Sequence, residues 1–187
     1  MPTATPSSAK RNSVVGMALD RIIDEAPGRV IVASFASLIS RIQQVVNAAI
    51  RQDRKVATMG RSMANNAKMA SKLGYLNAPS GTMVSLNEVR KLPHNRVVIV
   101  ATGSQGEPTS ALVRIANREH QDIEIMPGDT VVISASPIPG NETVVAKTID
   151  NLFRQGATVL YSRIAKVHVH GHASQEELKM MLNLVRP

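Results

Sequence analysis

Three histidines stand at alternate positions near the end of the chain, where His168, His170 and His172 lie in the segment VHVHGHAS. In an extended strand such side chains point to one side, and three imidazoles on one side could ligate zinc. Gly171 makes a straight strand doubtful, and no further ligand is obvious nearby. General acid/base chemistry or contact with a phosphate therefore remains an alternative to metal binding, as does a set of surface histidines.

A second candidate is the segment TGSQGEP, residues 102–108, which follows the apolar run RVVIVA. The apolar run predicts a strand, so the segment would lie at the carboxyl end of that strand, where parallel sheets bind phosphates. Its glycines allow close backbone approach, but no lysine follows, so it is neither a P-loop nor a dinucleotide fingerprint. We predict either a glycine-rich turn with Ser104 as the helix cap or a phosphate cradle. The cradle would comprise Gly103, Ser104, Gln105 and Gly106.

Polar side chains also stand where helices are expected to begin after the first two strands. Ser37, Arg41 and Arg61 place a hydroxyl and two guanidinium groups at these positions. Such groups suit a phosphate, although arginines there can equally be solvated surface charges.

The net charge of +8 comes almost entirely from the first half of the chain. Residues 1–96 hold 14 Lys and Arg against 5 Asp and Glu, whereas residues 97–187 hold 8 against 9. A basic surface of this kind favours salt-sensitive contacts with polyanions. Aromatic residues make up only 2%, so we expect a nucleic acid to be held mainly by its backbone rather than by stacked bases.

Cysteine is absent, which excludes disulfides and thiolate metal sites and fits a cytoplasmic location. No apolar run approaches the roughly 20 residues that cross a bilayer, and no secretion signal is visible, so we expect no membrane partner.

Apolar, β-branched runs alternate with amphipathic segments, which is typical of parallel sheets built from βαβ units. We predict an α/β fold with three α/β/α layers and a mainly parallel, Rossmann-like sheet of about five strands. Residues 1–13 are predicted to be a flexible tail or severed linker, and residues 14–187 one domain. The segment DIEIMPGDT predicts an additional strand and turn. The main strands are expected at residues 29–35, 55–59, 96–102, 130–135 and 158–161, and the helices at 14–26, 37–52, 62–73, 108–118, 141–155 and 174–185.

The segment VHVHGHASQEELKMMLNLVRP closely resembles a pattern of the ribonuclease J family, the metallo-β-lactamase/β-CASP ribonucleases. Four further segments occur in the family's order and at similar spacing. They are ASFASLISRIQQV, GRSMANN, LGYLN and VIVATGSQGEP. The resemblance covers residues 13–187 and is to the β-CASP domain only.

The resemblance implies a metal-dependent ribonuclease with 5′-to-3′ exonuclease and endonuclease activity, in which a metallo-β-lactamase domain holds two zinc ions. By this resemblance His172 would lie beside the scissile phosphate as a catalytic group. His168, His170 and Ala173 would help to hold an RNA phosphate, and residues 103–106 would line the pocket for a 5′-monophosphate. The implied partners are single-stranded RNA with a 5′-monophosphate end and the metallo-β-lactamase domain.

This sequence departs from the family pattern in two respects. His170 replaces the serine that usually precedes the Gly-His pair, so an imidazole would take the place of a hydroxyl. The HxHxDH metal-binding segment is absent. We therefore expect an excised domain that holds no cofactor and cuts nothing alone. The alternatives are a stand-alone α/β domain that binds a small phosphorylated ligand, and an oligomerisation or docking module, with a homodimer left open.

Overall fold

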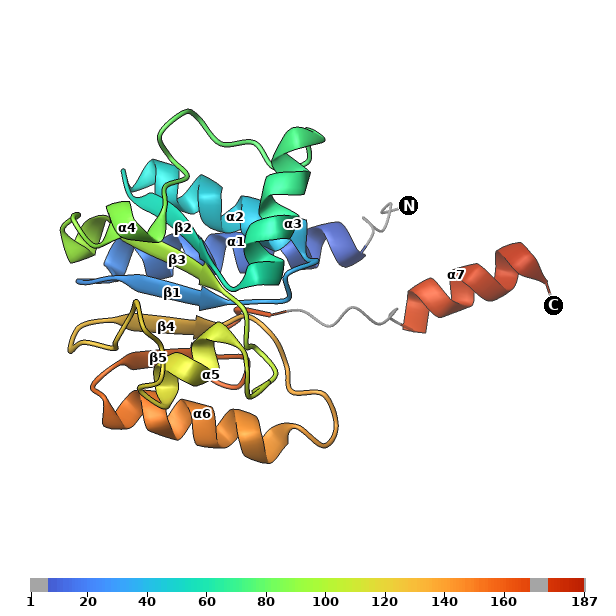
Figure 1. The fold of residues 1–187 in the computed structure, drawn as a ribbon. Helices are drawn as coiled ribbons and strands as arrows, with labels where there is room; N and C mark the ends of the chain where they lie inside the picture. The colour runs from blue at the N-terminus through green and yellow to red at the C-terminus, as the bar shows by residue number, and fades with distance from the viewer. Residues whose placement is uncertain (1–6, 169–174, 187) are drawn as a thin grey trace.

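The computed structural model describes residues 7–168 and 175–186, and its centre is a five-stranded sheet (Figure 1). All four pairs of neighbouring strands are parallel, and the strand order is β2-β3-β1-β4-β5. The strands are β1 (Val30–Ala33), β2 (Lys55–Met59), β3 (Val97–Ala101), β4 (Thr130–Ile133) and β5 (Thr158–Tyr161).

Helices cover both faces of the sheet and complete three layers (Figure 1). Val98 and Val100 of β3 face one buried cluster, whereas Val97 and Ile99 face the other. Because both faces are buried, the strands are apolar at every position rather than at alternate ones. One layer consists of α1 (Ser7–Glu25), α2 (Ile39–Arg51) and α3 (Arg61–Lys72). The other consists of α4 (Leu86–Val89), α5 (Ala111–Ala116) and α6 (Glu142–Arg154).

A buried ion pair joins the amino ends of the central strands β1 and β4. Arg29 donates from Nε to Asp129 Oδ1 at 3.0 Å and from Nη2 to Asp129 Oδ2 at 2.5 Å. The same Nη2 donates to the Glu124 carbonyl at 2.6 Å, and the Met126 N–H donates to Asp129 Oδ2 at 2.9 Å. Both charges are therefore paired and hydrogen-bonded, as burial requires.

The structure confirms the predicted three-layer α/β fold and its five strands, with bounds within two residues of those expected. The prediction of an additional strand within DIEIMPGDT is wrong. Residues 123–126 are irregular, although Ile123 and Ile125 are buried. The Glu124 carbonyl accepts from the Arg29 side chain and the Met126 N–H donates to the Asp129 side chain, so these two backbone groups are paired without a sheet ladder.

Two helices differ in length from the expected ranges. Helix α1 begins at Ser7 rather than at residue 14, so it includes part of the stretch predicted to be a tail, while residues 1–6 lie outside the described residues. Helix α5 begins only at Ala111, because a turn closed by the Ser110 N–H and the Glu107 carbonyl at 2.9 Å precedes it. The domain boundary at residue 14 stays a prediction.

The last helix is α7 (Gln175–Val185), as predicted. No described side chain of α7 is buried, and its exposed residues include Leu178, Met181 and Leu184. A short 3-10 helix, η1 (His94–Arg96), leads into β3. Within residues 7–168 and 175–186, no helix is long and apolar enough to span a membrane.

Candidate functional site

The carboxyl edge of the sheet has the topology of a ligand-binding crevice. The loops after β1 and β2 lead to helices on one face, whereas the loops after β3 and β4 lead to helices on the other. Because β1 lies between β3 and β4, its loop turns away from both of its neighbours. Open α/β sheets bind ligands where adjacent strands separate in this way.

The two glycines of the TGSQGEP loop occupy positions that other residues would strain. Gly103 has φ +111°, and a Cβ built on it would lie 2.4 Å from Ser110 Oγ. Gly106 has φ +74°, and its Cβ would lie 2.9 Å from Val144 Cγ2. The glycines are therefore required by the backbone conformation and the local packing.

Gln105 connects the β3 loop to the β4 loop. Its side chain is only 3% exposed; Nε2 donates to the Ser136 carbonyl at 2.9 Å, and Oε1 accepts from the Ile138 N–H at 2.8 Å. Ser104 is also buried and does not cap the next helix, since the N-cap of α5 is Ser110. The alternative that made Ser104 a helix cap is thus wrong. Gln105 therefore fixes the positions of the β3 and β4 loops relative to each other at the crevice.

The segment that leads to the histidine cluster is fixed at the same edge. Ser134, directly after β4, donates from Oγ to the Val167 carbonyl at 2.6 Å, and both residues are fully buried. His168 follows and is half-buried. The other predicted residues of the cluster, His170, His172 and Ala173, lie outside the described residues. The two segments singled out in the sequence are therefore both anchored to the loop after β4.

The polar residues expected at the helix starts lie in different environments. Ser37 and Arg61 are exposed, whereas Arg41 on α2 is 2% exposed. Arg41 Nε and Nη1 have no hydrogen-bond partner among the described residues. Burial lowers the pKa of Arg41 to about 10, so the side chain still carries its charge at neutral pH. A buried guanidinium without hydrogen-bond partners is unfavourable, so a ligand that supplies an acceptor, such as a phosphate, would be bound favourably there.

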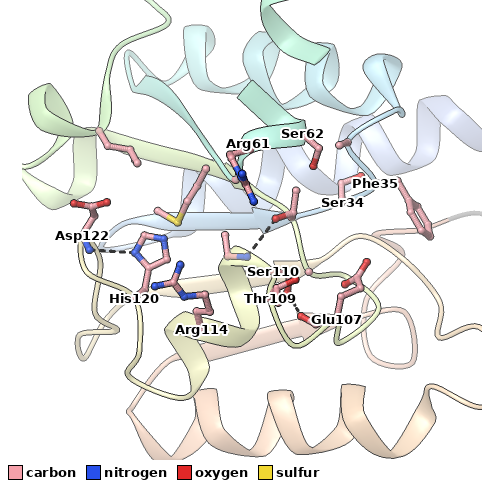
Figure 2. Close-up of a pocket in the computed structure, with 17 residues that line it drawn as sticks. Ser34, Phe35, Arg61, Ser62, Glu107, Thr109, Ser110, Arg114, His120 and Asp122 are labelled. Carbon is pink, nitrogen blue, oxygen red and sulfur yellow. Dashed lines mark hydrogen bonds between the residues drawn. The ribbon is translucent and has the colours of Figure 1, made fainter. Parts of the chain in front are cut away.

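A cleft of about 650 Å³ opens beside the TGSQGEP loop (Figure 2). Ser34 and Phe35 after β1, Gly60 at the start of α3 and Gly103 after β3 line it. Three side chains with N–H donors also line it. Arg61 comes from α3, whereas Arg114 and His120 come from α5 and the loop after it. Neither Arg114 nor His120 was predicted as a site residue, since neither lies in a local sequence motif.

His120 is held in one orientation by a backbone group. Its Nδ1 accepts from the Asp122 N–H at 3.1 Å, so in the neutral ring the proton resides on Nε2. Desolvation by burial, reinforced by the charge of Arg114, lowers the pKa of His120. The neutral ring therefore presents an N–H donor at neutral pH.

We expect His120 to titrate below the ordinary histidine pKa of about 6.5. Because the pKa of His120 is lower in the folded chain than in the unfolded chain, the unfolded chain binds more protons below about pH 6.5. The free energy of unfolding therefore falls as the pH falls through about 6.5, and His120 has no such effect at higher pH. Two-dimensional NMR should show the low midpoint, and Arg114→Gln should raise it. A midpoint of 6.5 or above in the parent chain would contradict this geometry.

The described residues do not fit the implied two-zinc site. Within them, no group of three or more His, Asp or Glu side chains lies close enough to hold a metal ion. Zinc sites take at least three protein ligands. No chemical step through a metal can therefore be assigned to the described part of this chain.

Comparisons with known proteins agree with the motifs. The model of the "Ribonuclease J, beta-CASP domain" family matches residues 27–152. Ribonuclease J of Synechocystis sp. is 49% identical over 187 residues, and ribonuclease J of Thermus thermophilus is 50% identical over 186. Ribonuclease J2 of Bacillus subtilis is 46% identical over 186 residues.

Each of these three matches covers the whole of this chain, but only 29%, 32% and 33% of the respective relative. The chain thus spans about a third of the length of the relatives that it matches. The family match begins before β1 and ends two residues before the end of α6, so it includes the first four strands of the sheet together with the TGSQGEP loop. The chain belongs to the ribonuclease J family and contains its β-CASP domain.

Proposed function

We propose that this chain is the RNA-binding domain of a ribonuclease J-like enzyme that processes and degrades RNA in the cytoplasm. In this proposal the complete enzyme is a metal-dependent 5′-to-3′ exonuclease and endonuclease. The chain guides single-stranded RNA, and the metallo-β-lactamase domain of the same protein cuts it. The chain alone binds RNA without cleaving it, because its described residues do not form a metal site.

The observation that carries this proposal is the connection of two predicted phosphate-binding segments through one loop. Gln105 binds the β4 loop at Ser136 and Ile138, and Ser134 of the same loop binds Val167. Fixed donors bind a phosphate more tightly than mobile ones, because less conformational freedom is lost on binding. The TGSQGEP loop and the segment at His168 are therefore preorganised for one RNA end.

Each predicted site residue has a proposed role. Residues 103–106 form the cradle for a 5′-monophosphate, and His168, His170 and Ala173 contact the RNA phosphates. Ser37, Arg41 and Arg61 supply further phosphate contacts near the starts of α2 and α3. His172 donates a proton or stabilises charge at the scissile phosphate once the other domain is present. Two zinc ions, held by that other domain, would activate the attacking water.

The first test measures binding of a short single-stranded RNA to this chain across a salt series, with cleavage monitored with and without added zinc. We expect affinity to fall with salt by about 0.7 log units per log unit for each phosphate contacted, and we expect no cleavage. Gln105→Ala should weaken binding about tenfold, since the lost amide bonds release the β3 and β4 loops.

Gln52→Ala is the matched control, because Gln52 follows α2 and precedes the amino end of β2, at the edge of the sheet opposite the crevice. It should bind RNA like the parent chain. Tight binding of a mononucleotide that ignores RNA length would instead favour a small phosphorylated ligand. A stable dimer with negligible RNA affinity would favour a docking module.

A further inference from the structure

Helix α3 carries a stripe of positive charge on its outer face. Arg61, Lys68 and Lys72 are exposed, and their spacings of seven and four residues place them in one row along the helix. The opposite side of the helix packs into the core. Its buried residues are Met63, Ala67 and Ala70. The three cations, called here the basic stripe, therefore point away from the core.

The basic stripe has no acidic side chains beside it in the sequence, since no Asp or Glu occurs from residue 54 to residue 87. Within the part of the chain that the structure describes, none of its three cations has an ion-pair or hydrogen-bond partner. Four other arginines at the surface are paired with carboxylates. They are Arg21 with Glu25, Arg51 with Asp20, Arg90 with Asp122 and Arg96 with Asp53. The charge of the stripe is thus not neutralised.

This arrangement of charges is unfavourable for the chain alone. Lys68 and Lys72 are four residues apart on one helix face, where like charges repel. Arg61 occupies the first turn of α3, where the helix dipole disfavours a cation. A solvated helix face usually mixes both signs of charge. A stripe of one sign is instead suited to a polyanion, which neutralises it.

An exposed aromatic ring lies at the end of the basic stripe. After α3, the Gly74 N–H donates to the Ser71 carbonyl at 3.2 Å, and the Tyr75 N–H donates to the Ala70 carbonyl at 2.8 Å. With Gly74 at φ +77°, these two bonds form a Schellman turn that holds the Tyr75 backbone against the last turn of the helix. The Tyr75 ring nevertheless is 72% exposed, more than any other aromatic side chain of this protein. A base could therefore stack on it.

The basic stripe begins at the crevice and leads away from it. Arg61 lines the cleft there, whereas Lys68 and Lys72 do not. Figure 1 shows α3 at the end of the sheet to which the strand arrows point, so the helix lies on the same side of the molecule as the crevice. The rise of the helix from Arg61 to Lys72 is about 16 Å, which is long enough to follow several nucleotides.

We infer that an RNA strand leaving the crevice continues along the outer face of α3, where Lys68 and Lys72 contact its phosphates and one base stacks on Tyr75. The inference rests on the proposed function, because it extends the RNA path beyond the nucleotides held in the crevice. Phosphates suit the lysines, and every base has a face that can stack on an aromatic ring. Continuity with the crevice favours RNA over an acidic protein, which would meet the same lysines.

The test measures how much the affinity of the 187-residue chain rises with RNA length. The probes are two single-stranded RNAs with the same 5′-monophosphate end, of about 4 and about 12 nucleotides. The length gain is the affinity for the longer RNA divided by that for the shorter. The α3 variants are Tyr75→Ala and the double replacement of Lys68 and Lys72 by Gln. Circular dichroism and thermal unfolding establish that each variant folds.

Helix α6, on the other face of the sheet, supplies matched controls. Lys147 and Arg154 are exposed on it, so replacing both by Gln removes the same charge from another surface. Phe153 on the same helix is 48% exposed, so Phe153→Ala removes an exposed ring elsewhere. Tyr75→Phe is the conservative variant, because stacking needs the ring and not the hydroxyl.

The parent chain should bind the longer RNA about a hundredfold more tightly than the shorter, and each α3 variant should lower this length gain about tenfold. The double lysine variant should also reduce the salt slope for the longer RNA by about 1.4, because two phosphate contacts of about 0.7 each are lost. Binding of the shorter RNA should be nearly unchanged. Tyr75→Phe and the α6 variants should keep the parent's length gain.

A length gain that is the same in the parent chain and in both α3 variants would overturn the inference, and the basic stripe would then be open to an acidic protein. An equal loss in the α6 variants would also overturn it, because the effect would follow net charge and not α3. In both cases RNA binding by the parent chain would still support the proposed function. No RNA binding by the parent chain would overturn the proposed function and this inference with it.

Discussion

Asp129→Ala is expected to lower the free energy of unfolding by about 3–5 kcal/mol, because it leaves the buried Arg29 guanidinium without its counter-charge. The two side chains are 8% and 1% exposed, so water cannot replace the lost carboxylate. The Met126 N–H loses its acceptor at the same time. Urea denaturation followed by circular dichroism measures the effect.

Asp20→Ala is the matched control for this prediction. Asp20 pairs with Arg51 at the surface, where an ion pair contributes about 1 kcal/mol or less. The double replacement Arg29→Met, Asp129→Leu should recover most of the stability, since it removes both buried charges together. A loss below about 1 kcal/mol for Asp129→Ala would show that the pair does not hold β1 and β4 together.

Arg41→Met is expected to act in the opposite direction and to stabilise the chain. Burial lowers the pKa of Arg41 to about 10, and a shift of this size corresponds to roughly 3 kcal/mol of unfavourable free energy for the charged form. Methionine removes the charge and fills a similar volume. We expect the melting temperature to rise by roughly 5–10 °C in differential scanning calorimetry.

The same replacement should weaken RNA binding about tenfold if Arg41 contacts a phosphate as proposed. Arg51→Met on the same helix is the control, because Arg51 is about half exposed and should change stability by about 1 kcal/mol or less. A variant that is both more stable and weaker in binding would identify Arg41 as a residue retained for function at the expense of stability. A lower melting temperature would contradict the conclusion that its guanidinium is unsatisfied.

The layers of the fold could be predicted because the strands are apolar at every position. Runs such as Val97–Ala101 have no polar face, which requires helices on both sides and hence a parallel sheet. The segment at Ile123 and Ile125 alternates polar and apolar residues, as a half-buried strand does, yet it forms no strand. Its backbone partners are side chains of Arg29 and Asp129, and Arg29 lies 95 residues from Glu124 in the chain. Local periodicity contains no information about such partners.

Only part of the candidate site could be predicted, because some of its contacts join segments that are far apart in the sequence. Loops that follow parallel strands meet at one edge, so the TGSQGEP loop could be placed at that edge from the sequence. The segment that contains His168 was singled out for its histidines, and its contact with the loop after β4 was not predicted. The role of Gln105 could not, because a glycine-rich loop looks the same whether its amide contacts a ligand or the next loop. Arg114 and His120 reach the cleft because of the way α5 packs on the sheet, and no local sequence motif predicts that packing.

The most direct test of the central claim is the affinity of this chain for a short single-stranded RNA with a 5′-monophosphate, compared with the same RNA carrying a 5′-hydroxyl. We predict that the monophosphate binds about tenfold more tightly at low salt, that the difference shrinks as salt is added, and that Ser104→Ala in the proposed cradle removes it without any cleavage in either case. Equal affinity for the two RNAs at every salt concentration would contradict the proposed cradle for a 5′-monophosphate.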